Sequence, residues 1–307
     1  MERKEQLIIV RGGGDIATGT IYKLNRCGYP VLVLESEQPS AIRRRVAFSE
    51  AVYDGKAQVE DMLCFCVSSL KEAWNVMGEG HVALMKDPEC RVLQEVTPWA
   101  LVDGILAKRN LGTHRGMADK TIALGPGFIA GEDVDLVIET MRGHNLGRVI
   151  SKGTALPNTG VPGKIGGYDR ERVVYAPGAG RVHVICEIGD KVEKGQVIAE
   201  VVAEKATAVR AVGFASDVCA EAEGGSAPDS GMVAAADSTS CRLSVAATIS
   251  GLVRGMIREG YPVTKGFKMA DIDPREEEYA NCFTISDKAR CIAGGVVEGL
   301  LYLERVQ

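Results

Sequence analysis

The chain has 307 residues, a formal net charge of −5 at pH 7, 46% hydrophobic residues and 25% charged residues. That length allows two domains with cores of their own, and the composition is ordinary for a globular protein. The net negative charge gives no general basic surface for nucleic acid, and no segment reaches the uninterrupted apolar length of a membrane helix. We therefore expect small molecules and proteins as partners, without nucleic acid or membrane.

The N-terminal residues pass from charged positions straight into a first apolar run, which is too short for the core of a signal peptide. This start predicts a cytoplasmic protein. The nine cysteines are scattered along the chain, and in a reducing compartment we expect them to be free thiols. Cys64 and Cys66 form a C-x-C pair on one face of an expected strand, but two ligands do not make a zinc site, so no metal site is predicted.

Residues 7–35, with the sequence LIIVRGGGDIATGTIYKLNRCGYPVLVLE, predict a strand, a glycine-rich turn, a helix and a second strand. Gly12, Gly14 and Ala17 fit the pattern G-x-G-x-x-[GA] of dinucleotide-binding folds, in which glycines let the backbone approach a phosphate. The N-terminus of the following helix would face the anion with its positive dipole end. Glu35 follows Gly14 by 35 − 14 = 21 positions, where an acid that bonds a ribose hydroxyl is expected. The alternative is that these glycines only form a tight turn.

A loop with three consecutive arginines follows the second expected strand. Arg43, Arg44 and Arg45 come just past the carboxyl end of that strand, and such a loop lies close to the ligand crevice of an open α/β sheet. Guanidinium groups bind phosphate or carboxylate oxygens in bidentate fashion, so a ligand clamp is one interpretation. A solvated charged turn is the other, and the sequence favours neither.

Strands and helices alternate over residues 1–145, which predicts a Rossmann-like, doubly wound and mainly parallel sheet. The carboxyl ends of such strands line the ligand crevice. An aspartate at such an end can simply cap a helix, and glycines there can simply turn the chain, but their common placement predicts a binding site. The residues at these ends are Gly12, Gly13, Gly14, Asp15, Glu35, Asp103, Gly104, Gly125 and Gly127.

From residue 146 the chain becomes rich in glycine and proline, which predicts an all-β second domain over residues 146–280. Within it, residues 176–200 align without a gap with residues 247–271, at an offset of 247 − 176 = 71. The matched glycines and valines imply two equivalent β units, a pattern that resembles the halves of the biotinyl/lipoyl barrel-sandwich fold. Residues 206–246 are rich in alanine, serine and glycine, and we expect them to be a flexible insert.

Lys205 lies in the sequence EKAT, which looks like the context of lipoyl-lysine in carrier domains. A carrier domain returns to its second half within several residues of that lysine, whereas here the long insert intervenes. A lipoyl or biotin carrier role is therefore the less favoured hypothesis, and an ordinary surface lysine is the alternative.

Residues 281–307 predict an amphipathic C-terminal helix that is capped by Ser286 and packs back on the first domain. The small residues Ala293, Gly294 and Gly295 would permit close packing there.

Long runs of sequence along most of the chain carry a family resemblance. They are VRGGGDIATG (10–19), AIRRRVAFSEAVYDG (41–55), LVDGILAKRNLGT (101–113), LGPGFIAGEDVDLVIETMRGHNLGRVI (124–150), ALPNTGVPGKIGGY (155–168) and FTISDKARCIAGGVVEG (283–299). With these runs the chain resembles the accessory protein family of selenium-dependent molybdenum hydroxylase systems. Its N-terminal half is similar to the Rossmann domain of xanthine dehydrogenase accessory proteins.

The resemblance implies a maturation factor with a molybdenum hydroxylase as its client and the molybdenum cofactor, a pterin dinucleotide, as its ligand. On this interpretation the turn from Gly12 to Asp15 holds a phosphate, Glu35 binds a ribose, and Arg43 and Arg44 reach outer phosphates. One of the thiols would ligate molybdenum or carry sulfur or selenium, with Cys64, Cys66 and Cys291 as the candidates.

The competing hypothesis is an NAD(P)- or nucleotide-dependent enzyme on the same scaffold. Glu35 suits NAD, because an acid at this position binds the ribose hydroxyls. The sequence contains no convincing acid–base pair, so no catalytic residue is assigned.

Overall fold

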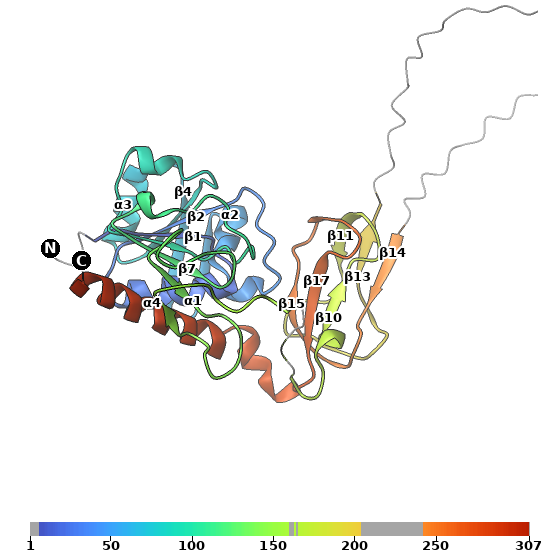
Figure 1. Cartoon of the computed structure of the whole chain (residues 1–307). Helices are drawn as coiled ribbons and strands as arrows, with labels where there is room; N and C mark the ends of the chain where they lie inside the picture. The colour runs from blue at the N-terminus through green and yellow to red at the C-terminus, as the bar shows by residue number, and fades with distance from the viewer. Residues whose placement is uncertain (1–5, 160–162, 164, 204–241, 307) are drawn as a thin grey trace, which may run out of the picture.

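Figure 1 shows the chain as a computed structural model, which describes residues 6–159, 163, 165–203 and 242–306. The fold is mixed α/β, with a large, mainly parallel sheet and a C-terminal helix, which confirms that part of the predicted fold class. A second unit made of small antiparallel sheets lies beside the α/β unit (Figure 1). Lys205, the candidate carrier residue, lies outside the described residues. Among the described helices, none is both long and apolar enough to cross a membrane.

Apolar, β-branched runs form the strands of the large sheet, and several of them are buried along their whole length. The strands are β1 (Ile8–Arg11), β2 (Val31–Glu35), β3 (Lys56–Val59), β4 (Met62–Val67), β5 (Val82–Lys86), β6 (Ala100–Asp103), β7 (Lys120–Leu124), β8 (Leu136–Ile138) and β9 (Val149–Ile150). Their order across the sheet is β3-β4-β5-β2-β1-β6-β7-β8-β9. The strands from β4 to β8 in this order run parallel, whereas β3 and β9 add antiparallel edges.

The strand order switches sides at β1: the chain first adds strands on one side of β1 and later adds strands on the other side. The strands β2 and β5 extend the sheet on one side of β1, and the chain then crosses to add β6 on the other side. At such a switch point the connections that follow the two central strands diverge, which leaves a crevice beyond their carboxyl ends. The glycine turn after β1 lies at this position.

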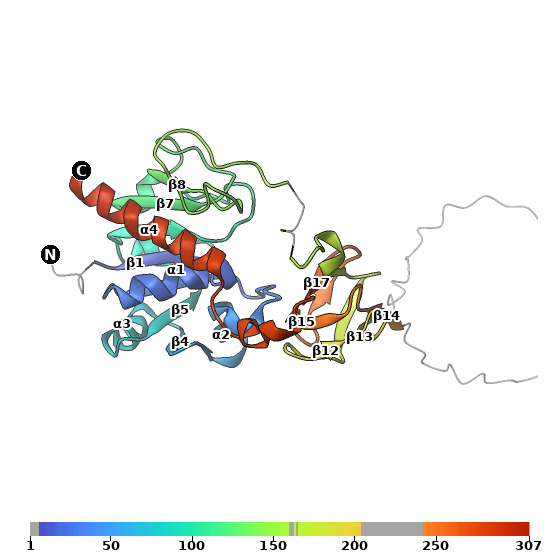
Figure 2. The same ribbon diagram turned by 90° about the horizontal axis from the view of Figure 1, so that it is seen from below.

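Helices cover both faces of the large sheet. On one face, α1 (Asp15–Arg26) and α4 (Asp287–Val306) pack together (Figure 2), and their apolar residues share a core with β1 and β2. On the other face, α3 (Leu70–Gly78) joins a second cluster, while the short α2 (Ala51–Asp54) lies with the first. Short 3-10 helices complete the fold: η2 (Arg44–Val46), η3 (Phe48–Glu50), η4 (Arg91–Gln94), η5 (Arg115–Met117), η6 (Arg170–Arg172) and η7 (Glu276–Cys282).

The C-terminal helix α4 begins where Ser286 accepts a hydrogen bond from the backbone N–H of Ala289 at 3.2 Å. This bond satisfies one of the free donors of the first turn. The helix then runs back along α1 and contacts β7, β8 and β9 (Figure 2). The last segment of the chain therefore completes the core of the first unit.

Two four-stranded antiparallel sheets enclose the core of the second unit. Their strands are β10 (Val173–Tyr175), β11 (Gly180–Val184), β12 (Lys191–Val192), β13 (Val197–Val202), β14 (Arg242–Ala246), β15 (Gly251–Met256), β16 (Pro262–Val263) and β17 (Lys268–Asp273). One sheet has the order β10-β17-β15-β12, and the other has the order β14-β13-β11-β16.

The repeated segments form equivalent strands in these two sheets. The first copy forms β11, β12 and β13, and the second forms β15, β16 and β17 at the same relative positions. Strand β11 pairs with β13 of its own copy and with β16 of the other, and β15 pairs in the same way with β17 and β12. Each copy therefore contributes one short strand to the other copy's sheet.

The end of the expected insert forms a strand, which corrects the predicted boundary at residue 246. Residues 242–246 form β14, which pairs antiparallel with β13 through the contacts from Val197 to Val202. The composition of the preceding residues does not reveal this strand, because its partner lies before the insert in the sequence.

The two units contact each other through the segment that follows β2. The backbone N–H of Met256 donates to the carbonyl of Ile42 at 2.8 Å. Arg258 reaches the carboxylates of Glu50 and Asp54, with 2.9 Å from Nη1 to an oxygen of each. The hydrogen bonding of Arg258 to Asp54 lowers the pKa of the Asp54 carboxyl.

A further link joins the loop after β8 to the first turn of α4, and it predicts an acid-sensitive contribution to stability. Arg142 donates two hydrogen bonds to the Asp287 carboxylate at 2.8 and 3.0 Å, which lower the pKa of Asp287 to about 2 from 3.8. Because the folded pKa is depressed, this contribution is present above about pH 4 and is lost as the pH falls towards 2. The pair is exposed to solvent, so we expect a small effect.

The variant Arg142→Gln tests this contribution. Its melting temperature should lie slightly below that of the wild type at pH 7, and the difference should vanish near pH 2. Arg305→Gln, at the exposed far end of α4, should show no such pH-dependent difference. A gap between Arg142→Gln and the wild type that stays constant from pH 7 to pH 2 would contradict the assignment.

Candidate functional site

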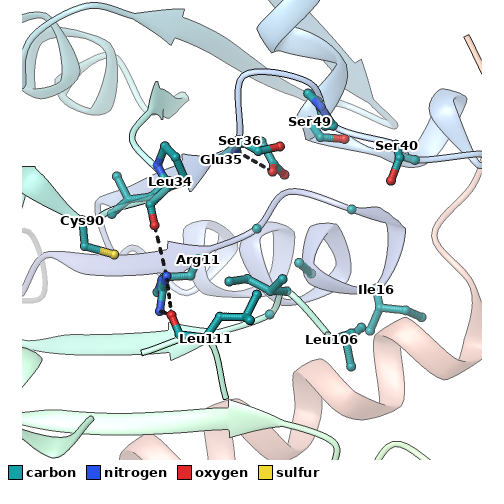
Figure 3. Close-up of a pocket in the computed structure, with 18 of the residues that line it drawn as sticks. Arg11, Ile16, Leu34, Glu35, Ser36, Ser40, Ser49, Cys90, Leu106 and Leu111 are labelled. Atoms are coloured by element: carbon teal, nitrogen blue, oxygen red, sulfur yellow. Dashed lines mark hydrogen bonds between the residues drawn. The ribbon is translucent and has the colours of Figure 1, made fainter. Parts of the chain in front are cut away.

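A cavity of about 780 Å³ lies beyond the carboxyl ends of β1, β2 and β6 (Figure 3). This volume is in the range of sites for cofactors and other small molecules. Five of the residues expected at the strand ends line it, namely Gly12, Gly14, Asp15, Glu35 and Gly104. The structure thus brings together the first part of the expected site, and its other members lie elsewhere.

The structural constraint that favours glycine differs among the three glycines of the turn. Gly12 has a φ of +89°, and a Cβ there would lie 3.1 Å from the Cα of Ile105. A Cβ on Gly13 would lie 2.9 Å from the backbone nitrogen of Ser49. A Cβ on Gly14 would meet nothing within 4 Å, and Gly14 has an ordinary φ of −64°. Packing therefore explains the first two glycines, whereas the third leaves open space in the cavity.

The N-terminus of α1 opens on this space. Gly14 is its N-cap residue, and no side chain of the described residues caps the helix. The unpaired N–H groups of a first helical turn and the helix dipole together attract an anion. Asp15 adds a negative charge here, but its carboxylate lies 3.7 Å from Nη1 of Arg43, which offsets that charge.

Glu35 ends β2 and holds the glycine turn. Its Oε2 accepts a hydrogen bond from the backbone N–H of Gly13 at 2.7 Å. Its Oε1 accepts one from the backbone N–H of Ser36 at 2.7 Å (Figure 3). A carboxylate has about four lone-pair sites, so each oxygen of Glu35 retains one for a further donor. Glu35 can therefore support the turn and accept a hydrogen bond from a ligand hydroxyl.

Arg11 forms one wall of the cavity, and sequence analysis did not predict it. Arg11 is 5% exposed, and it donates to the carbonyl of Leu111 at 3.4 Å (Figure 3) and to that of Pro88 at 3.1 Å. It thereby ties the loops after β5 and β6 to the end of β1. A charged residue that ends an apolar strand just before the glycines is the signal that could have identified it.

Asp103 does not line the cavity, which corrects its predicted role. It is 2% exposed, and its Oδ2 accepts a hydrogen bond from the hydroxyl of Thr113 at 2.6 Å. The same oxygen lies 3.7 Å from Nη1 of Arg11. Asp103 therefore pairs with Arg11 behind the cavity wall and positions it, whereas the adjacent Gly104, expected at the same strand end, does line the cavity.

Arg43 does not line the cavity, contrary to the ligand-clamp interpretation. Its Nη2 donates to the carbonyls of Asn281 at 3.0 Å and Thr284 at 3.4 Å, and the residue is 7% exposed. Burial, followed by the nearby charge of Arg254, lowers the pKa of Arg43. The buried side chain connects the first unit to the segment that leads into α4.

Arg44 also bonds residues of the second unit and does not bind in the cavity. Its Nε donates to the carbonyl of Met256 at 2.8 Å, and its Nη2 lies 3.3 Å from the carboxylate of Glu187. The predicted clamp is therefore wrong for both arginines, because their partners belong to the second unit and to the segment that follows it.

Gly125 and Gly127 also lie outside this cavity. A Cβ on Gly125 would lie 2.7 Å from the hydroxyl of Thr140, and one on Gly127 would lie 2.7 Å from the backbone of Arg109. Both glycines have positive φ values, of +79° and +113°. They turn the chain and allow close packing, which is the alternative that the sequence left open.

The cysteines that sequence analysis considered for sulfur or metal chemistry do not come together in the structure. Cys90 lines the cavity, but burial raises the pKa of its thiol, as it does for Cys64 and Cys66. Cys291, on α4, is exposed and donates to the carbonyl of Leu146 at 3.1 Å. Within the described residues, no group of three or more His, Cys, Asp or Glu side chains is arranged to hold a metal ion.

Loops that follow β2, β5 and β6 supply the lining residues that sequence analysis missed. They are separated in the sequence and meet only because their strands are neighbours in the sheet. These loop residues include Ile105 and, labelled in Figure 3, Ser36, Ser40, Ser49, Cys90, Leu106 and Leu111.

The sequence of the chain matches no family model. It is 42% identical over 298 residues to a protein of Escherichia coli K12, the uncharacterized protein YqeB, and the match covers 97% of this chain. The same match covers 48% of YqeB, so the chain spans about half the length of this curated relative.

Solved structures give only a weak likeness. The product-bound ectoine utilization protein EutE (DoeB) from Ruegeria pomeroyi is 13% identical with a TM-score of 0.23, over 86% of this chain and 56% of that chain. An aspartoacylase family protein from Mesorhizobium loti is 12% identical with a TM-score of 0.28, over 88% and 85%. A succinylglutamate desuccinylase/aspartoacylase from Rhodobacter sphaeroides is 11% identical with a TM-score of 0.24, over 87% and 85%.

The comparisons give no support to the functional expectation. The names of the solved structures are those of an ectoine utilization protein, aspartoacylases and desuccinylases, and none of them is the name of a molybdenum hydroxylase accessory protein. The predicted role in molybdenum hydroxylase maturation, with its molybdenum and selenium chemistry, is therefore not retained. At TM-scores of 0.23 to 0.28 the likeness transfers no hydrolase activity to this chain either.

Proposed function

We propose that the chain binds a dinucleotide, or a related nucleotide that bears phosphate, in the cavity beyond β1. The ligand's phosphate would lie against the first turn of α1, and a ribose hydroxyl would donate to Glu35. An acid at the end of the second strand favours NAD over NADP, because the 2′-phosphate of NADP would meet the carboxylate.

One observation carries this proposal. The turn leaves open space at Gly14, directly in front of a helix N-terminus that no described side chain caps. Packing requires glycine at the two preceding positions but not at Gly14, so the absence of a side chain there is explained by a ligand that fills the space.

The surroundings of the turn support the same function. The cavity lies at the switch point of a parallel sheet, where ligands bind in open α/β folds. Buried hydrogen bonds hold its wall at Arg11 and its acid at Glu35, so the site is largely formed before a ligand arrives.

We propose in addition that the second unit is a barrel-sandwich domain of the biotinyl/lipoyl type. Two antiparallel sheets around one core, and a repeat whose copies exchange one short strand, support this classification.

Nucleotide preference tests the proposed function. NAD⁺ should bind the wild-type chain at least about tenfold more tightly than NADP⁺, because the Glu35 carboxylate accepts a ribose hydroxyl and repels a 2′-phosphate. Glu35→Gln should weaken NAD⁺ binding by about tenfold and narrow the difference between the two nucleotides. Isothermal titration calorimetry measures both affinities.

The exposed residue Glu37 provides the matched control, since Glu37→Gln removes the same charge outside the cavity. Its affinities should equal those of the wild type. Tighter binding of NADP⁺ than of NAD⁺ by the wild type would contradict the role of Glu35.

A further inference from the structure

A second cavity, of about 570 Å³, adjoins the proposed nucleotide cavity, and Leu106 (labelled in Figure 3) lines both of them. Pro126 and Thr140, which follow the ends of β7 and β8, line the second cavity. Because β6, β7 and β8 are parallel neighbours, this adjoining cavity continues the ligand crevice along the same edge of the sheet.

The loop between the two cavities holds strained backbone. Leu106 and Lys108 have φ values of +60° and +63°, which residues other than glycine rarely adopt. Such strain is costly and concentrates at ligand sites. The loop therefore places Leu106 between the cavities and Lys108 at the adjoining one at an energetic cost.

Positive side chains line the adjoining cavity without acidic ones. Lys108, Arg142 and Lys288 are its cations, and no Asp or Glu of the described residues lines it. Arg142 is already bonded to the Asp287 carboxylate, so its charge is balanced. The two lysines remain.

Three carboxylates outside the cavity act on Lys288 through their charge, and arginines pair with two of them. One is Asp287, which is bonded to Arg142. Another is Asp15, whose carboxylate lies 3.7 Å from Nη1 of Arg43.

The third carboxylate is that of Glu139, which is 3% exposed. It accepts hydrogen bonds from the backbone N–H groups of Met141 at 2.7 Å and Leu156 at 2.8 Å. Lys108 and Lys288 are thus opposed by a single carboxylate that lies outside the cavity, and one positive charge is left over.

Lys288 lies where folding alone does not favour a lysine. It is half-buried, and it makes no hydrogen bond or ion pair with another described residue. It is the second residue of α4, where the helix dipole disfavours a cation. Burial, followed by the charge of Arg142, lowers the pKa of its ammonium group. Its Nζ still has access to solvent, so an anion in the cavity could supply the missing partner.

Apolar side chains complete the lining of the adjoining cavity. They are Leu106, Pro126, Met141 and Leu156. Apolar walls with a few charged groups suit an organic anion better than an inorganic one. The nicotinamide ring of NAD⁺ is itself positively charged, so the lysines do not suit that part of the nucleotide.

From this arrangement we infer that the adjoining cavity binds a small organic acid. Its carboxylate would lie against Lys288 and Lys108, and its carbon chain would lie against the apolar residues. The acid would be a second ligand, separated from the nucleotide by Leu106. Its role beside a nucleotide rests on the proposed function, whereas its binding to the cavity does not.

Butyrate, a short carboxylate, is the probe, and butyramide is its uncharged analogue of the same shape. Saturation-transfer NMR on the full chain, without nucleotide and at constant ionic strength, should show binding of butyrate and at least about tenfold weaker binding of butyramide. Lys288→Gln should weaken butyrate binding at least about tenfold, because a charge-assisted hydrogen bond is lost.

Lys71→Gln is the matched control. Lys71 is the second residue of α3, as Lys288 is of α4, but it is exposed and lines neither cavity. This variant should bind butyrate like the wild type. If Lys288→Gln does not fold, Lys108→Gln replaces it, because Lys108 is exposed and lines the same cavity. Unchanged butyrate affinity in the folded variant overturns the inference.

Butyrate could also enter the nucleotide cavity, so Gly14→Val provides the arm that separates the two sites. Binding retained in Gly14→Val and weakened in Lys288→Gln supports the acid site. Binding lost only in Gly14→Val overturns it and places the acid in the nucleotide cavity. Equal binding of butyramide, or no binding of butyrate to the wild type, also overturns it. A protein that binds butyrate through Lys288 but does not bind NAD⁺ would contradict the proposed function alone.

Discussion

Gly14→Val is expected to abolish nucleotide binding while the protein stays folded. A Cβ at this position meets no atom within 4 Å, and the backbone already has a φ of −64°, so the folded chain accepts a side chain. The added isopropyl group would occupy the space in front of the first turn of α1, where the proposed phosphate binds. We expect an affinity loss of at least about a hundredfold, because several charge-assisted hydrogen bonds are blocked together.

Gly78→Val is the matched control. Gly78 ends α3, has no positive φ, and its added Cβ also meets nothing within 4 Å, but it lies outside the nucleotide cavity. The control should bind NAD⁺ like the wild type. Titration calorimetry gives the affinities, and circular dichroism shows that both variants are folded. Unchanged NAD⁺ affinity in folded Gly14→Val would exclude this turn as the phosphate site.

The largest effect on stability is expected for Gly295→Ala in α4. Alanine in place of glycine usually stabilises a helix by about 1 kcal/mol. Here the new Cβ would overlap the carbonyl oxygen of Gly147 and lie 3.0 Å from Cγ2 of Ile138. Because the overlapping atom belongs to the backbone, α4 must move away from the sheet, and we expect a loss of about 3 kcal/mol or more in unfolding free energy.

The neighbouring glycine of the same helix provides the control. A Cβ on Gly294 would lie 3.6 Å from the flexible end of Lys23 and meet nothing closer. Gly294→Ala should therefore be neutral or stabilise the protein by up to about 1 kcal/mol. Urea denaturation measures both variants. Similar unfolding free energies for the two would mean that α4 does not pack on the sheet as described.

The local sequence pattern was sufficient to predict the glycine turn and Glu35 as parts of the candidate site. The conformation of the glycine turn and its distance to Glu35 depend on a strand, a helix and a second strand that are adjacent in the sequence. The same holds for the cap of α4 at Ser286, which is a contact within one helical turn. Short-range hydrogen bonding and periodicity determine such features, so a single sequence reveals them.

Residues whose partners are distant in the sequence could not be assigned in this way. Arg43 and Arg44 follow a strand end as ligand-binding arginines do, but they bond carbonyls of Asn281 and Met256, more than two hundred positions away. The lining residues that sequence analysis did not predict, such as Cys90 and Leu111, come from loops that meet only in the folded sheet. No local rule distinguishes an arginine that clamps a ligand from one that joins two domains.

The most direct test of the nucleotide site is a crystal structure of the full chain grown with NAD⁺. The account predicts pyrophosphate oxygens about 2.7–3.2 Å from backbone N–H groups in the first turn of α1, with a ribose hydroxyl in contact with the Glu35 carboxylate. Density for the nucleotide at another place, or an empty cavity beyond β1 at saturating NAD⁺, would contradict it.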